Sequence, residues 1–232
     1  MKRIAFYGGS FDPPHNGHLT IARKLILLFK LDEVVFVPAF HAPHKKDKNP
    51  TSAFHRYAML CLATNGLQQI RVSTMELDAP SKPYTVETLS KLKDELTDAQ
   101  IFFVMGADSW TEITTWRDWE KVLTLTNIIV VTRPEYPIGF THITREIRER
   151  IIDLRGNFNA KAQIRKDAEQ AKVEIDKGQR TKDKGQIIYI TDVVNLDISA
   201  TEIRRQIREN IQSWRELVSD EVAKYLEKYD IY

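Results

Sequence analysis

The chain has 232 residues, of which 42% are hydrophobic, and this composition excludes a wholly disordered protein. Its 34 basic and 32 acidic residues nearly cancel, so no uniformly polycationic, nucleic-acid-binding surface is indicated. The single cysteine, Cys61, excludes an intramolecular disulfide and a multi-cysteine zinc site. No apolar run approaches the ~18 residues of a membrane span, and about five apolar residues before the first glycines are too few for a signal peptide. We therefore expect a reduced, soluble, cytoplasmic protein that binds neither membrane nor nucleic acid.

Short apolar runs alternate with longer segments of helical periodicity along most of the chain. Uninterrupted apolar runs predict strands at residues 3–7, 33–37, 70–73, 101–105, 128–132 and 187–190. Apolar residues at helical spacing predict helices at 18–30, 53–64, 86–95 and 116–123, with Ser52 and Thr85 capping the second and third. This alternation is typical of a doubly wound, Rossmann-like α/β fold, with a parallel sheet, helices on both faces and ligands at the carboxyl ends of the strands.

Residues 141–185 interrupt the alternation. They include 12 Lys or Arg and 8 Asp or Glu, a net charge of +4, and their apolar residues are scattered. We expect a charged helical insertion, solvated and dispensable for chemistry, within a single domain that spans residues 1–232. A phosphate- or partner-binding arm is the alternative. After it the apolar pattern resumes, and a final amphipathic helix is predicted from about residue 220.

The first predicted strand runs into the string GGSFDPPHNGHL, residues 8–19. Gly8 and Gly9 allow the backbone to approach a ligand closely. His15 and His18 stand three residues apart at the start of a predicted helix, so both side chains can face the same side. Because a helix N-terminus attracts phosphate, two imidazoles placed there suit the stabilisation of a phosphate in transfer.

The string GGSFDPPHNGH, with its HNGH core, resembles the HxGH signature of the nucleotidyltransferase superfamily. Five further segments, in the family's order, resemble the bacterial nicotinate-mononucleotide adenylyltransferases: VPAFHAPHK, KPYTVETL, GADSWTEITTWRDW, VVTRPEY and DISATEIR. The resemblance covers residues 3–134 and 186–229 and leaves 141–185 outside. It implies transfer of the AMP moiety of ATP to nicotinate mononucleotide, with deamido-NAD and pyrophosphate as products.

The resemblance also implies the residues of the site. His15, His18 and Arg204 are the expected catalytic residues. The residues expected to bind ATP are Gly8, Gly9, Ser10, Phe11, His15, His18, Gly106, Asp108, Arg133, Ile198, Ser199, Thr201 and Arg204. The residues expected to bind the mononucleotide are Ser10, His44, Lys45, Tyr84, Thr85, Asp108, Trp116 and Arg117.

The residue types themselves fit these roles. Ser199 or Thr201 can cap the helix that carries Arg204, which brings helix amides and a guanidinium to one anion. Asp108 directly follows a strand, where a carboxylate can accept hydrogen bonds from ribose hydroxyls, or can cap a helix. Trp116 offers an aromatic face for a pyridine ring, whereas Trp119 is expected to pack in the core.

One position departs from the family pattern, because its ISST segment reads Ile198-Ser199-Ala200-Thr201 here. The hydroxyl usual at position 200 is missing, although the Ala200 amide can still donate at the start of the following helix. We expect Mg²⁺ to come with ATP, bound by phosphates and waters without a dedicated protein cage. Whether the protein forms a homo-oligomer is left open by the sequence.

Three other functions remain as alternatives. A sibling transferase would use nicotinamide mononucleotide or another phosphorylated acceptor. The two HxxH pairs, His15 with His18 and His41 with His44, could instead bind zinc in a metal-dependent hydrolase. A non-catalytic module would bind ATP without releasing pyrophosphate.

Overall fold

A computed structural model describes residues 1–40, 51–79, 83–132, 138–156, 185–194 and 196–232. In this part of the chain, seven strands form one sheet in the order β3-β2-β1-β4-β5-β7-β6, and every neighbouring pair is parallel. The strands are β1 (Lys2–Gly9), β2 (Glu33–Pro38), β3 (Ile70–Val72), β4 (Ala99–Gly106), β5 (Asn127–Val131), β6 (Ile151–Asp153) and β7 (Ile188–Thr191). The parallel sheet that the sequence predicts is confirmed.

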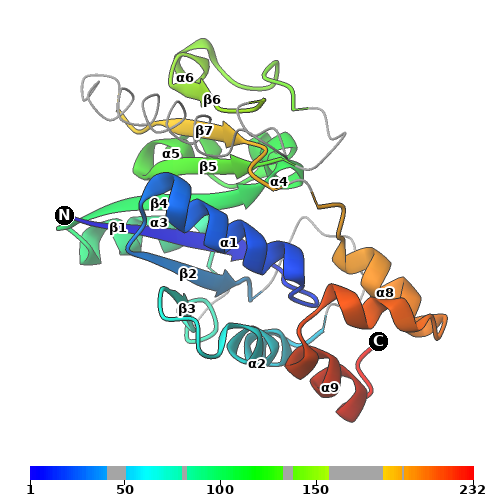
Figure 1. The fold of residues 1–232 in the computed structure, drawn as a ribbon. Helices are drawn as coiled ribbons and strands as arrows, with labels where there is room; N and C mark the ends of the chain where they lie inside the picture. Colours follow the sequence, from blue (N-terminus) through cyan, green and yellow to red (C-terminus); the bar gives the residue numbers. More distant parts are fainter. Residues whose placement is uncertain (41–50, 80–82, 133–137, 157–184, 195) are drawn as a thin grey trace.

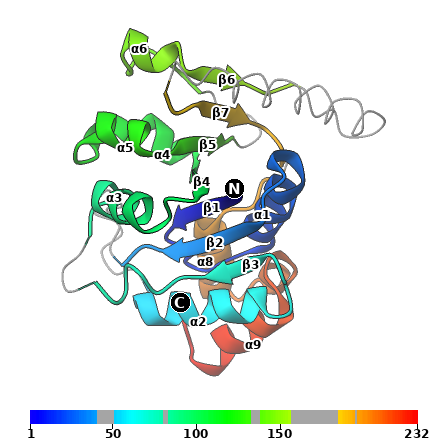
Figure 2. The ribbon, with the colours of Figure 1, turned by 90° about the vertical axis from the view of Figure 1, so that its left-hand side faces the viewer.

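Helices cover both faces of the sheet, as Figures 1 and 2 show. Alternate residues of β1 belong to different cores, because successive side chains in a strand point to opposite faces. Ala5 and Tyr7 pack with α1, whereas Ile4 and Phe6 pack with α3, α4 and α5. These helices are α1 (Asn16–Phe29), α3 (Thr85–Glu95), α4 (Ala107–Thr111) and α5 (Trp119–Leu125).

A third core lies beyond the sheet, where α2 meets the C-terminal helices (Figure 1). Met59 of α2 and Ile203 of α8 are fully buried there together with Val222 of α9. The elements are α2 (Ala53–Thr64), α8 (Ala200–Arg208), the 3₁₀ helix η3 (Gln212–Leu217) and α9 (Asp220–Lys228). This core attaches the C-terminal segment to the first half of the chain.

The elements differ from their predicted positions mainly at helix ends. The fourth predicted helix begins at Trp119 rather than Trp116, because Trp116 is extended after the 3₁₀ helix η1 (Ile113–Thr115) and Asp118 is left-handed. Ser52 occupies the cap position of α2 without a hydrogen bond from its side chain. Thr85 is the first residue of α3, and Tyr84 takes the cap position instead.

The solvated insertion predicted for residues 141–185 is wrong for its first part. Ile143, Ile147 and Leu154 are buried, a short helix α6 (Arg145–Arg148) forms, and β6 pairs with β7 at the edge of the sheet. A helix of four residues and a strand of three are too short to produce a recognisable period. The other residues of the predicted insertion, 157–184, lie outside the described ranges.

The strand order reverses between β1 and β4, because β2 and β3 continue on one side of β1 while β4 and β5 continue on the other. Ligands of open α/β sheets bind at such a switch point, beyond the carboxyl ends of the strands. The helices of the described residues do not include one long and apolar enough to cross a membrane.

Candidate active site

Two histidines lie at the switch point, where the loop after β1 leads into α1. His15 is the N-cap residue of α1, and its ring stacks on the ring of His18 with 3.7 Å between centroids and 24° between planes. The ring of Phe11 meets that of His18 edge-on at 4.9 Å. Both imidazoles line a cleft together with Gly106 at the end of β4, Thr132 after β5 and Ile198 before α8. The tertiary structure therefore brings together residues of four segments, GGSFDPPHNGH, GADSWTEITTWRDW, VVTRPEY and DISATEIR, each of which contains a residue predicted to bind ATP.

A hydrogen bond determines which nitrogen of His18 can donate. The backbone N–H of His15 donates to Nδ1 of His18 over 3.2 Å, so Nδ1 carries a lone pair. In the neutral ring the proton is therefore on Nε2. His18 can thus offer an N–H to an anion at the positive end of α1.

The two middle residues of HNGH support the histidines. A Cβ atom on Gly17 would lie 3.0 Å from Cε1 and Nδ1 of His15, so glycine permits the His15 ring to lie over the first turn. The Asn16 side chain donates to the carbonyls of Glu216 (3.0 Å) and Val218 (3.4 Å), which ties the helix start to the C-terminal segment. Sequence reasoning assigned neither residue a role, although both stand inside the motif.

Arg204 joins α8 to the loop that precedes the histidines. Its Nη1 donates to the carbonyl oxygen of Asp12 over 2.6 Å, and Nη2 donates to the Thr201 hydroxyl over 3.3 Å. Ser199 caps α8 by accepting a hydrogen bond from the Glu202 amide at 3.1 Å, as predicted. Ala200 is the first helical residue, so its amide belongs to the first turn despite the missing hydroxyl.

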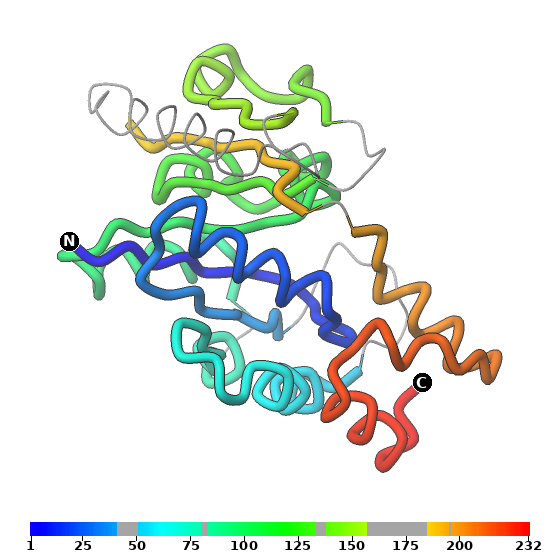
Figure 3. The backbone as a smooth tube through the Cα atoms, viewed as in Figure 1, coloured from blue at the N-terminus to red at the C-terminus, as the bar shows by residue number. Residues whose placement is uncertain are grey.

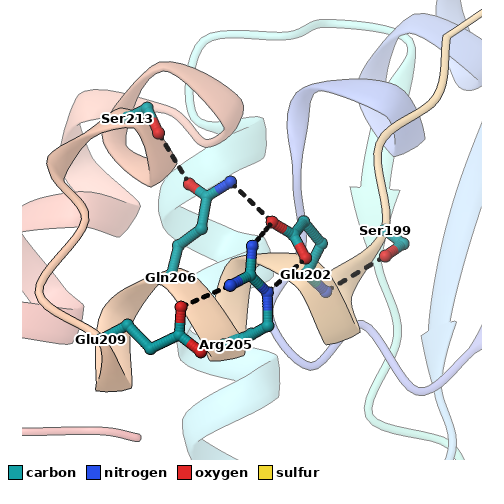
Figure 4. A network of polar contacts seen from close by, with 6 residues as sticks. All are labelled: Ser199, Glu202, Arg205, Gln206, Glu209 and Ser213. Carbon is teal, nitrogen blue, oxygen red and sulfur yellow. Dashed lines mark hydrogen bonds and ion pairs between the residues drawn. The ribbon is translucent and has the colours of Figure 1, made fainter.

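A separate polar network runs along α8 and is drawn in Figure 4. Arg205 donates to both carboxylate oxygens of Glu202, at 2.6 and 2.8 Å, and also pairs with Glu209. Gln206 donates to Glu202 over 3.0 Å and accepts from Ser213 at the same distance. The hydrogen bonds from Arg205 and then Gln206 lower the pKa of Glu202 to about 2. Arg205 is therefore hydrogen-bonded within α8, whereas the neighbouring Arg204 donates to the carbonyl oxygen of Asp12.

The residues predicted for the nicotinate end form a second group. The guanidinium of Arg117 lies over the ring of Tyr84, 4.7 Å from its centroid, and Nη1 is 3.8 Å from Glu87. Glu87 also accepts a hydrogen bond from the Tyr84 amide at 2.9 Å. Trp116 is partly buried against the core under α3 and α5. In a doubly wound fold, the starts of α3 and α5 lie at the carboxyl edge of the sheet, the same edge as the histidines.

Gly8 and Gly9 are the last two residues of β1, and Ser10 follows them. Asp108 is exposed in the first turn of α4 and accepts a hydrogen bond from the Ser109 amide at 2.9 Å, while a Cβ on Gly106 would lie 2.6 Å from its Oδ1. Glycine at 106 therefore permits this close approach of the carboxylate. His44, Lys45 and Arg133, and also His41, lie outside the described residues.

Arg56 is a residue of the site region that sequence reasoning missed. It is 3% exposed, and its guanidinium donates to the carbonyls of Ser10 (2.6 Å), Ala39 (2.6 Å) and Thr51 (3.0 Å). Burial lowers its pKa, against the opposing charge of Asp12. Arg56 thereby joins the loops that follow β1 and β2. The sequence feature that could have indicated burial of Arg56 is its position on the apolar face of α2, three residues before Met59 and four before Leu60.

A larger cavity, of about 520 Å³, lies elsewhere. Its lining includes Thr124, Arg150 and Gln186, which precede β5, β6 and β7. It is therefore at the amino ends of the strands, the edge opposite to that at which ligands of open α/β sheets bind. Among the residues described, no group of three or more His, Cys, Asp or Glu side chains could hold a metal ion.

Comparison with known proteins agrees with this architecture. The model of the cytidylyltransferase-like family matches residues 6–206, from β1 through most of α8. A protein of Nocardioides sp. named "Probable nicotinate-nucleotide adenylyltransferase" is 34% identical over 225 residues, covering 97% of this chain and 91% of its own length. A protein of the same name from Thermoanaerobacter sp. is 34% identical over 231 residues, covering 99% and 94%. The chain belongs to the nicotinate-nucleotide adenylyltransferase family.

Solved structures show the fold of this family at greater sequence distance. The nicotinic acid mononucleotide adenylyltransferase of Plasmodium falciparum complexed with NaAD aligns with a TM-score of 0.66 at 20% identity, over 100% of this chain and 98% of that one. A second structure of that enzyme, complexed with APC, gives a TM-score of 0.64 at 19% identity over the same shares. The doubly wound adenylyltransferase fold is therefore shared.

Proposed function

We propose that this protein transfers the AMP moiety of ATP to nicotinate mononucleotide, producing deamido-NAD and pyrophosphate in the cytoplasm as a step of NAD biosynthesis. The main structural support for this function is the stacked pair of His15 and His18 at the start of α1. The loop before this pair is contacted by Arg204 of α8. Imidazole N–H donors, one guanidinium and the N-termini of two helices together suit a triphosphate. Full-length identity of 34% to relatives named for this activity supports the same reaction.

The proposed chemistry is an in-line attack by the phosphate oxygen of the mononucleotide on the α-phosphorus of ATP. The bond from α-phosphorus to the bridging oxygen breaks, and that oxygen leaves with pyrophosphate. Because the attacking phosphate is already an anion near pH 7, no general base is required. Catalysis then consists of alignment and charge stabilisation.

The ATP side of the site is assigned to two segments. Nε2–H of His18 is directed to the α-phosphate and the transition state, with His15 beside it. Arg204, Ser199 and Thr201 take the β- and γ-phosphates, with the first amides of α8. The remaining ATP contacts fall to Gly8, Gly9, Ser10, Phe11, Gly106, Asp108, Arg133 and Ile198.

The nicotinate side is assigned to the pair of Tyr84 and Arg117, with Thr85 and Trp116. Trp116 presents an aromatic face, and Arg117 adds positive charge beside Tyr84. Ser10, His44, Lys45 and Asp108 complete this group.

Mg²⁺ is proposed to arrive with ATP, held by phosphate oxygens and waters, and to neutralise charge on the leaving pyrophosphate. Asp12, the carboxylate in the loop that precedes His15, already accepts hydrogen bonds from Thr51 and Tyr232. We therefore assign no protein carboxylate as its cage.

The test of this function is pyrophosphate release with ATP and each mononucleotide in turn. We expect release with nicotinate mononucleotide and a lower kcat/KM with nicotinamide mononucleotide. A reaction without any mononucleotide is the control. Absence of release with nicotinate mononucleotide would overturn the proposal, and preference for the amide would replace its substrate.

Trp116→Ala is expected to raise the KM for the mononucleotide by about fivefold, the equivalent of ~1 kcal/mol, while the KM for ATP stays nearly constant. The reason is the loss of one stacking face on the pyridine side. Steady-state kinetics with each substrate varied measures the effect. Trp119→Ala is the control, because Trp119 packs against the same core and its loss should lower stability rather than substrate affinity. A change in the KM for ATP instead would assign Trp116 to the adenine side.

A further inference from the structure

The C-terminal segment of the chain returns to the loop of the HNGH motif. The hydroxyl of Tyr232 donates a hydrogen bond to Oδ1 of Asp12, three residues before His15. Figures 1 and 3 show the C-terminus near α8 and α9, and Ile231 and Tyr232 pack against the third core. Residues 220 positions apart thus meet at the proposed active site.

Asp12 is the point at which several segments converge. It is 7% exposed, and its other carboxylate oxygen accepts a hydrogen bond from the Thr51 amide at 3.2 Å, just before α2. Its carbonyl oxygen accepts the 2.6 Å hydrogen bond from Arg204. The loop between β1 and α1 is therefore joined at one residue to α2, α8 and the C-terminal segment.

The phenol is suited to act as a donor in this place. Burial raises the pKa of Tyr232, and the neighbouring negative charge of Asp12 raises it further. The hydroxyl therefore stays protonated at neutral pH and donates to the carboxylate. A hydrogen bond to a charged acceptor is stronger than one between neutral groups.

We propose that Tyr232 is a positioning residue, which through Asp12 holds the loop carrying His15 and His18 in place against Arg204 on α8. This inference rests on the function proposed above. The loop and α8 would contact one triphosphate from two sides. Their relative position therefore decides how well the α-phosphorus is aligned with the attacking phosphate oxygen. Small displacements of aligned groups lower the rate strongly.

Tyr232→Phe tests the proposal, because it removes the hydroxyl and keeps the ring. We expect kcat to fall about tenfold, in line with the loss of one charge-assisted hydrogen bond, with an unchanged KM for the mononucleotide and an unfolding temperature that is lower by several degrees but stays above the assay temperature. Tyr229→Phe is the matched control. Tyr229 is half exposed in the same segment and packs its ring against those of His55 and Tyr225, so wild-type kinetics are expected. Wild-type kcat in Tyr232→Phe, or a rate loss accounted for by unfolding, would overturn the proposal.

A double-mutant cycle tests whether Tyr232 acts through Asp12. If it does, Tyr232→Phe combined with Asp12→Ala should be no slower than Asp12→Ala alone, because alanine offers no acceptor to the Tyr232 hydroxyl. Multiplicative rate losses would show that Tyr232 acts elsewhere and would contradict the proposed route.

Hydrogen exchange measures the position of the loop without any reaction. Amides of residues 8–19 should exchange faster in Tyr232→Phe than in the wild type or Tyr229→Phe, while those of β4 keep their protection. Unchanged exchange in this loop would overturn the proposal. If the wild type releases no pyrophosphate, the proposed function fails, yet the exchange result still decides whether Tyr232 holds the loop.

Discussion

His18→Ala is expected to lower kcat by about 10²–10³ while weakening ATP binding far less. The Nδ1 atom of His18 already accepts a hydrogen bond from the His15 amide, so the neutral ring carries its proton on Nε2 and can donate from there. An N–H fixed in advance toward the developing charge stabilises the transition state more than the bound substrate. Single-turnover rates and ATP titrations of the same variant separate the two effects.

His142→Ala is the control for this experiment. His142 is hydrogen-bonded to the carbonyl of Trp110 at 3.1 Å, and its ring meets the Trp110 ring edge-on, outside the cleft. Its replacement should leave kcat near the wild-type value. A folded His18→Ala protein with wild-type turnover would contradict the role assigned to His18.

Arg56→Met is expected to lower the free energy of unfolding by about 3 kcal/mol. Methionine keeps much of the buried stem but removes the donors that satisfy the carbonyls of Ser10, Ala39 and Thr51. Buried carbonyls without donors retain their desolvation penalty. Equilibrium urea unfolding measures the loss, with an unchanged m-value as evidence that the denatured state is the same.

Arg71→Met is the matched control. The Arg71 side chain is 68% exposed and pairs with Glu33 at the surface, so its loss should cost no more than about 1 kcal/mol. Equal losses in the two variants would show that the Arg56 hydrogen bonds contribute little. Because Arg56 joins the loops after β1 and β2, which we propose to bind the substrates, weaker binding of both substrates is expected beside the loss of stability.

The long strands could be predicted from the sequence because the pattern that reveals them is local. Each long strand is buried on both faces, so its apolar residues run without interruption and can be recognised without knowledge of neighbours. β6 escaped recognition because it has three residues at the sheet edge. Its place is determined by pairing with β7 rather than by its own pattern.

The candidate site divides in the same way. The HNGH motif is one contiguous segment, and Ser199 lies directly before the helix that it caps. The roles of both at helix starts follow from local chemistry. Arg56 could not be predicted, because an arginine in an amphipathic helix is usually solvated and two of its acceptors, the carbonyls of Ser10 and Ala39, lie 46 and 17 residues away in the sequence.

The sequence by itself determined the parallel α/β architecture, the motif at the end of β1 and the family. Only the tertiary structure decided that Arg204 and Tyr232 both meet Asp12, and that the His15 ring lies on that of His18. Periodicity and caps depend on residues within one or two turns, so they can be read along the chain. Contacts across 192 or 220 residues depend on how whole elements pack, and no local pattern records that geometry.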